Sequence, residues 1–161
     1  MLIGIVGKPN VGKSTFFKAA TLANVEIANH PFVTIKPNRG VGFVRIDCVD
    51  VDFNVQCTPR EGYCLKHNRF VPVELLDVAG LGPGAYEGKG MGNQFLNDLG
   101  QADALIHVVD AAGSTNSMGE PKAPGSHDPG NDIRFLENEL DMWYYQLLMK
   151  SWEKMGKIAK L

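Results

Sequence analysis

Residues 7–14 read Gly-Lys-Pro-Asn-Val-Gly-Lys-Ser, with two glycines five positions apart followed by lysine and serine. This is the spacing of a phosphate-binding loop. Its glycines allow a tight turn whose backbone N–H groups converge on a phosphate, and the helix that follows adds the positive end of its dipole. Lys13 is expected to bridge β- and γ-phosphate oxygens, and the Ser14 hydroxyl is expected to bind Mg²⁺.

The flanks of this loop have the order that the motif needs. An aliphatic run at residues 2–6 predicts a buried strand before it, and residues 14–23 predict a helix after it. Residues 24–40 lack periodicity and predict a loop, as do residues 47–68. Further strands are expected at the ranges 41–46, 70–76 and 104–109.

A second motif follows the expected strand at 70–76. Asp77-Val78-Ala79-Gly80 places an aspartate where it could reach magnesium through water and a glycine N–H where it could touch the γ-phosphate. Thr34, in the loop before it, is the natural third contributor to the metal site, and it would bind only with the γ-phosphate present, which makes the loop a switch. The expected phosphate contacts are Gly7, Lys8, Pro9, Asn10, Val11, Gly12, Lys13, Ser14, Thr15 and Gly80.

The segment after Asp77 is dense in glycine, with six between residues 80 and 92. Such a segment can rearrange with nucleotide state, although a merely loose loop would share the composition. Leu81 stands where many switch GTPases have a water-orienting glutamine, so another group must do that work. His107 in the fourth strand is a catalytic candidate, although a satisfied histidine in an apolar strand is the simpler interpretation.

The C-terminal third predicts a long exposed loop over residues 111–130 and then a helix. Asp128 before Pro129 resembles an N-cap with proline at the first helical position. Apolar residues continue at helical spacing and need a sheet to cover, at Ile133, Leu136, Leu140, Trp143 and Leu147. Lysines 150, 154, 157 and 160 follow at three- and four-residue steps, which favours a solvated face over an RNA-contacting one.

Composition describes an ordinary globular chain: 161 residues, 44% hydrophobic and 21% charged, with a formal net charge of −2. There is no overall basic excess that would suggest nucleic acid, and no apolar run approaches the roughly 20 residues of a membrane span. We therefore expect a cytoplasmic protein with no membrane and no DNA partner. The length suits one domain.

Cysteine occurs at three positions, an odd number that gives no closed disulfide framework. Cys48, Cys57 and Cys64 form, with His67, a Cys, Cys, Cys, His set that could ligate zinc. The spacings lack the paired Cys-x-x-Cys knuckle of a structural site, so small apolar thiols and a surface histidine in a hairpin insertion are the alternative.

Together these residues resemble the Obg family of translation-factor GTPases, specifically its YchF subfamily in the archaeal form. The likeness spans nearly the whole chain, and its most specific part follows Asp77. In the loop before Ile35 the family usually carries paired threonines, and this chain has Val33 in place of the first. The motifs that carry the likeness lie at residues 7–15, 29–35, 77–81, 87–93, 95–96, 104–110, 127–129 and 135–137.

The resemblance implies an α/β fold of three layers, the Ras-like sheet of P-loop NTPases with helices on both faces, and it implies association with ribosomes or ribosomal RNA. Such a domain should add a base-reading strand ending in Asn-Lys-x-Asp or Asn-x-x-Glu, and neither follows the fourth strand. We expect residues 1–161 to be a truncated G domain, incomplete at its C-terminal side, with the base-recognition strand and later domains absent.

Three functional classes compete. A hydrolytic switch for GTP fits best, with ATP as the alternative substrate because subfamily members differ between guanine and adenine. A P-loop kinase would not need Thr34 and a glycine-rich switch, whereas a non-hydrolytic nucleotide sensor or ribosome-binding module is compatible with Leu81. The oxygen of Asn10 could hold K⁺ against the phosphates, although asparagine also commonly stabilises turns.

Overall fold

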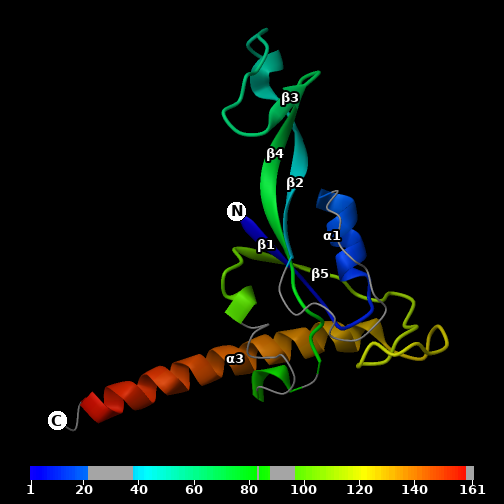
Figure 1. Ribbon diagram of the computed structural model, residues 1–161, viewed down its shortest axis with the longest axis vertical. Coiled ribbons are helices and arrows are strands. Elements are labelled where there is room, and N and C mark those ends of the chain that lie inside the picture. Colours follow the sequence, from blue (N-terminus) through cyan, green and yellow to red (C-terminus); the bar gives the residue numbers. More distant parts are fainter. Residues whose placement is uncertain (22–37, 83, 88–96, 159–161) are drawn as a thin grey trace.

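A five-stranded mixed sheet forms the centre of the computed structural model, which describes residues 1–21, 38–82, 84–87 and 97–158 (Figure 1). The strand order is β2-β4-β1-β5, and β3 pairs with β4. The elements in chain order are β1 (Leu2–Val6), α1 (Lys13–Thr21), β2 (Asn38–Asp47), the 3₁₀ turn η1 (Val49–Val51), β3 (Tyr63–Leu65), β4 (Asn68–Asp77), the 3₁₀ turn η2 (Ala85–Glu87), β5 (Ala104–His107) and α3 (Pro129–Ile158).

Strand direction decides where the functional loops meet. β1 runs parallel to both β4 and β5, with Ile5 opposite Asp77 and Val6 opposite His107. The carboxyl ends of these three strands therefore share one edge, which is where open α/β sheets bind ligands. The phosphate loop leaves β1 at this edge, and the Asp77 motif leaves β4 there.

Helices cover both faces of the sheet, as the resemblance implied. Ile5 packs with Phe17 of α1 and with Val73 and Leu75, whereas the next residue, Val6, packs on the opposite face with Leu136 of α3. Because neighbouring residues of a strand point to opposite faces, burial of both Ile5 and Val6 requires a cover on each side. The chain thus forms a three-layer α/β fold.

β2 and β4 form a long antiparallel ribbon that extends past β1 and α1 to a tip carrying η1 and β3 (Figure 1). Pro72 lies in the middle of β4, opposite Phe43 of β2. On the other edge of β4, β3 pairs only as far as Phe70 and β1 begins only at Glu74. Pro72 therefore falls in a gap where β4 has one neighbour, the position in which a strand tolerates a missing N–H.

Several predicted boundaries need correction. The strands predicted at 41–46 and 70–76 are longer, because each continues along the ribbon, and the strand predicted at 104–109 ends at His107. The segment 47–68, predicted as irregular, contains η1 and β3. The helix predicted at 14–23 begins at Lys13 and is described to Thr21, with residues 22–23 outside the described part.

Helix α3 begins where it was predicted to begin. Its N-cap is Asp128, whose Oδ1 accepts a hydrogen bond from the Gly130 N–H at 2.9 Å. The predicted apolar stripe is only partly covered: Leu136 is buried and Trp143 is partly buried, whereas Ile133 and Leu147 are exposed. No helix among the described residues is long and apolar enough to cross a membrane.

Candidate functional site

Lys13 lies at the first position of α1, with its side chain folded back over the phosphate loop. Its Nζ donates a hydrogen bond to the Lys8 carbonyl oxygen at 2.8 Å, and the residue is only 7% exposed. A lysine side chain that bridges the loop at this point holds a positive charge over the ring of backbone N–H groups. Burial lowers the pKa of Lys13 to about 8, and the neighbouring Asp77 carboxylate opposes that shift.

Ser14 and Asp77 meet at the carboxyl edge of the sheet. The Ser14 hydroxyl donates to Asp77 Oδ2 at 2.7 Å, although the two residues are 63 positions apart in the chain. Asp77 is fully buried, and its Oδ1 has no hydrogen-bond partner among the described residues. A hydroxyl and an under-satisfied carboxylate side by side are hard oxygen donors of the kind that Mg²⁺ takes, so these residues fit that ion.

Burial and local contacts act on Asp77 in opposite directions. Burial raises the pKa of its carboxyl group, while the Ser14 hydroxyl, the Lys13 charge and the Asn38 side chain lower it. A buried carboxylate is costly to charge unless a cation or several donors face it. A cation beside Asp77 would lower that cost further.

The backbone after Asp77 lies directly against the phosphate loop. The Leu81 N–H donates to the Gly7 carbonyl oxygen at 3.1 Å, and a Cβ on Gly80 would stand 2.8 Å from Pro9 Cα. Only glycine allows this approach. The Leu81 side chain is 1% exposed and packs in the core with Val6 and Leu76, so it points away from any water that would attack a phosphate.

The segment after β5 covers the phosphate loop, and its prediction as a plainly exposed loop is wrong for this part. The Asn10 side-chain amide donates to the Gly119 carbonyl oxygen at 2.9 Å. Gly119 has φ +77°, and a Cβ there would stand 2.3 Å from the Pro9 carbonyl oxygen. Residues 120–126 are exposed, as predicted. No periodic pattern predicts this contact, because it joins Gly119 to Pro9 and Asn10, which are distant in the chain.

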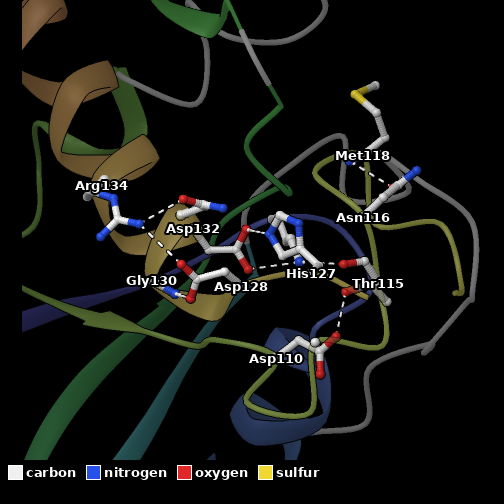
Figure 2. Close-up of polar contacts among 12 residues, drawn as sticks. Asp110, Thr115, Asn116, Met118, His127, Asp128, Gly130, Asp132 and Arg134 are labelled. Atoms are coloured by element: carbon white, nitrogen blue, oxygen red, sulfur yellow. Dashed lines mark hydrogen bonds and ion pairs between the residues drawn. The ribbon is translucent and has the colours of Figure 1, made fainter. Parts of the chain in front are cut away.

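Asp110 shapes the same segment. Its carboxylate accepts a hydrogen bond from the Thr115 hydroxyl at 2.7 Å (Figure 2). It also accepts one from the Ser114 N–H at 2.8 Å. These bonds, the Thr115 hydroxyl first, hold the pKa of Asp110 below its usual value. The hydrogen bonds to Asp110 also position Thr115, whose carbonyl oxygen accepts a hydrogen bond from Lys8 Nζ at 3.0 Å.

Lys8 is held in a buried ion pair beneath the phosphate loop. Its Nζ lies 2.8 Å from Asp132 Oδ2, and the two side chains are 1% and 5% exposed. The other Asp132 oxygen lies 2.7 Å from His127 Nε2 (Figure 2). The side chain of Lys8 therefore points to α3, and a phosphate contact by Lys8 would come from its backbone. Sequence reasoning missed this pair, because nothing in the local pattern joins residue 8 to residue 132.

Helix α3 also holds the segment that follows the Asp77 motif. Glu139 is 3% exposed, and its two carboxylate oxygens each accept a backbone N–H at 2.9 Å, from Gly84 and from Tyr86. Asp132 and Glu139 are seven residues apart, which is two helical turns and one face. One face of α3 thus contacts both the phosphate loop, through Asp132, and the segment after Asp77, through Glu139.

Of the other residues predicted for the site, His107 lies within the described part of the chain and Thr34 does not. His107 is half-buried at the end of β5, and burial lowers its pKa, opposed by the charge of Asp132. It ends β5 at the carboxyl edge of the sheet, and the charge of Lys13 also lowers its pKa. Thr34, and the glycines from Gly88 to Gly92, lie outside the described residues.

The pKa of Lys13 predicts how nucleotide affinity depends on pH. Below about pH 8 the lysine is charged before and after binding, so affinity should be flat. Phosphate oxygens raise the pKa of Lys13 in the complex, so above pH 8 binding takes up a proton and affinity should fall, by about tenfold between pH 7.5 and pH 9.

GDP is the appropriate titrant for this measurement, because its phosphates are already fully ionised above pH 7.5 or so. Lys18→Ala, which removes an exposed lysine of the same helix, should show the same profile as the unmodified chain. An affinity independent of pH over this range would contradict the role given to Lys13.

A glycine-rich loop between a strand and a helix, with a buried aspartate from a parallel neighbouring strand on its serine, defines the class of P-loop nucleoside triphosphatases. Within that class, residues 2–128 match the family described as 50S ribosome-binding GTPase, and the chain belongs to that family.

Individual relatives are consistent with this family assignment. The chain is 52% identical to the uncharacterised GTP-binding protein MJ1332 of Methanocaldococcus jannaschii, over 99% of this chain and 40% of the relative. It is 39% identical to the ribosome-binding ATPase YchF of Bacillus subtilis, over 98% of this chain and 40% of that protein. The chain thus spans about two fifths of the length of these relatives.

A solved structure also matches over the whole chain. The GTP-binding protein from Pyrococcus horikoshii OT3 superposes with a TM-score of 0.72 and 40% sequence identity, covering 100% of this chain and 39% of that one. This likeness agrees with the GTPase fold and with the YchF-type resemblance of the sequence motifs.

Proposed function

We propose that this chain is the phosphate- and magnesium-binding part of a switch protein that hydrolyses GTP to GDP and phosphate. One observation carries the proposal: the Ser14 hydroxyl and the buried Asp77 carboxylate lie 2.7 Å apart at the edge where the phosphate loop begins its helix. Oxygen donors from a phosphate loop and from a parallel strand are the pair that hold magnesium in this class.

Each residue of the loop has a role in this proposal. Backbone N–H groups of residues 7–15 cradle the phosphates, and Lys13 exchanges its bond to the Lys8 carbonyl for phosphate oxygens. Ser14 would hold the magnesium directly, and Asp77 would hold it through water. When bound, magnesium neutralises charge that develops on the β- and γ-phosphate oxygens.

Two segments would make the protein a switch. Gly80, whose backbone lies against Pro9, offers its N–H to the γ-phosphate, and Thr34 completes the metal shell only while that phosphate is present. Loss of the γ-phosphate releases both. Leu81 is buried in the core, so the attacking water must be oriented by His107, by a monovalent cation or by a partner, and intrinsic turnover is expected to be slow.

ATP is the second candidate substrate, because relatives of 36–39% identity are named ribosome-binding ATPases. Competition between labelled GTP and unlabelled ATP on the full-length protein distinguishes the two, and phosphate release without an added acceptor distinguishes a hydrolase from a kinase or a sensor. Tighter binding of GTP and acceptor-independent release are the results that support this proposal.

The same relatives suggest the partner. Because they are named ribosome-binding, we propose that the full-length protein works in the cytoplasm on the ribosome or its RNA. Cosedimentation of the full-length protein with ribosomes, in the presence of GTP or of GDP, tests this: binding that depends on the nucleotide supports the switch, and no binding in either state contradicts it.

Potassium is expected to accelerate hydrolysis relative to sodium. The Asn10 amide nitrogen donates to the Gly119 carbonyl, so its side-chain oxygen is the atom that would bind a cation beside the phosphates. Such an ion would stabilise the negative charge of the transition state, as an arginine finger does. Turnover should therefore be compared in matched potassium and sodium chloride.

Two variants test whether Asn10 is responsible for a difference between the two salts. Asn10→Ala should lose the difference between the salts, whereas Asn131→Ala, which removes an exposed asparagine side chain at the start of α3, should keep it. Equal rates in both salts for the unmodified protein would show that a potassium ion has no role in hydrolysis.

A further inference from the structure

The tip of the β2–β4 ribbon lies far from the phosphate loop. Asp77 ends β4 at the nucleotide edge, and Asn68 begins this ten-residue strand at the tip. An extended strand of that length spans about 30 Å. Residues 48–67 form the tip, and Figure 1 shows them projecting beyond the rest of the sheet, away from α3.

This tip has no hydrophobic core. Its large apolar side chains are exposed, including Val49 at 67%, Phe53 at 72% and Leu65 at 58%. Within residues 48–67, all of which the structure describes, Asp50 is the one buried residue, at 3% exposure. Small segments that cannot bury apolar surface need another source of order, commonly a disulfide or a metal ion.

Three thiols lie close together beside the buried aspartate. The Sγ atoms of Cys48, Cys57 and Cys64 all lie within 4.8 Å of one another, and the three residues are half-buried and unoxidised. Asp50 Oδ2 lies 3.6 Å from Cys64 Sγ and accepts the Cys57 N–H at 3.0 Å. The centre of the tip thus gathers side chains of types that can bind a metal ion.

We propose that Cys48, Cys57 and Cys64 bind one zinc ion that holds the tip of the ribbon together. A tetrahedral zinc site with Zn–S bonds of about 2.3 Å places its sulfurs about 3.8 Å apart, so each thiol needs to move by less than about 1 Å. Thiolate-rich ligand sets select zinc over magnesium or calcium.

Asp50 supplies the fourth ligand, because its Oδ2 is the carboxylate oxygen beside the thiols. Its other oxygen, Oδ1, lies 3.0 Å from His67 Nδ1, so the histidine orients the aspartate from outside the thiol cluster. The Arg69 guanidinium acts electrostatically on Cys57, and its Nη1 is buried without a hydrogen-bond partner among the described residues. It can compensate the negative charge that three thiolates and a carboxylate place on the ion.

The set differs from the one that the sequence suggested. The spacing of the cysteines, without a Cys-x-x-Cys pair, argued against a structural site, and His67 was the expected fourth member. Strand pairing removes the objection: β3 turns back on β4 and brings Cys64 beside residues that are distant in sequence. His67 bonds Asp50 instead.

Metal analysis of the full chain, purified under reducing conditions and dialysed against excess zinc, tests the proposal. We expect one zinc per chain, three thiols that react with a thiol reagent only after a chelator is added, and, with Co²⁺ in place of zinc, the thiolate charge-transfer and visible bands of a tetrahedral complex. Three freely reactive thiols with no bound metal, a disulfide in the reduced preparation, or a Co²⁺ spectrum without thiolate bands would overturn it.

Matched variants locate the ion. Cys57→Ser should lower zinc affinity by more than tenfold, and Asp50→Asn should lower it as well, by about ten- to a hundredfold. Asp52→Asn, an exposed acid of the same loop, should leave zinc affinity unchanged. Equal affinity in Asp50→Asn and Asp52→Asn would remove Asp50 from the site. Nucleotide affinity should not change in any of these variants, because the tip lies about 30 Å from Asp77.

Discussion

Lys13→Ala is expected to weaken GTP binding by about a hundredfold or more and to abolish measurable hydrolysis. The reason is the position of the Lys13 ammonium group, which is buried over the loop and bonds the Lys8 carbonyl at 2.8 Å. Its charge is partly desolvated before binding, as the pKa of about 8 indicates, so phosphate oxygens gain a strong interaction at little further cost of desolvation.

Lys18→Ala is the matched control for this prediction. Lys18 lies on the same helix, and its side chain is exposed. The control should bind and hydrolyse GTP as the unmodified protein does. Titration calorimetry of both variants with GTP measures the difference. If Lys13→Ala bound GTP with unchanged affinity, the assignment of residues 7–14 as a phosphate loop would be wrong.

Asp132→Asn is expected to lower the free energy of unfolding by about 3–5 kcal/mol. Lys8 and Asp132 form an ion pair at 2.8 Å whose side chains are 1% and 5% exposed. Removing one partner leaves the lysine charge buried without compensation, which costs far more than the pair itself contributes. Because Lys8 lies in the phosphate loop, the variant should also weaken nucleotide binding.

Arg134 offers a control on the same helix. It forms an ion pair with Asp128 at 3.3 Å, and the two side chains are 67% and 61% exposed. Arg134→Gln should therefore change the free energy of unfolding by no more than about 1 kcal/mol. Replacing both partners of the buried pair, as Lys8→Met with Asp132→Leu, should recover most of the stability lost in Asp132→Asn.

Urea denaturation of the four proteins provides the measurement. The buried pair would have no special importance if Asp132→Asn and Arg134→Gln were equally stable. A double variant less stable than Asp132→Asn would show that the carboxylate acts through His127 or another contact instead of through Lys8.

Much of the fold follows from local pattern. The aliphatic run before Gly7 is β1, and the Asp128-Pro129 pair caps α3, because both signals act within a few residues. The short strand β3 and the full length of β4 do not follow, since they depend on pairing along a ribbon whose Pro72 is tolerated only in a gap between partners. Local propensity cannot indicate where such a gap falls.

The candidate site also contains contacts that local sequence patterns predict and contacts that they do not. Lys13, Ser14 and Asp77 were predicted from motif spacing, and the contacts of Lys13 with Lys8 and of Ser14 with Asp77 bring them together. The ion pair of Lys8 with Asp132 was not predicted, because it joins the first loop to the last helix. Such contacts arise from packing of distant elements, and single-sequence patterns have no periodicity that records them.

The central claim is that Ser14 and Asp77 form a magnesium site beside the bound phosphates. It is tested most directly by the affinity for GTP with and without Mg²⁺, in the unmodified protein and in Asp77→Asn, which keeps the shape of the side chain and removes its charge. The account predicts that magnesium tightens GTP binding at least tenfold in the unmodified protein and has little effect in Asp77→Asn. An equal effect of magnesium on both proteins, or no effect on either, would contradict it.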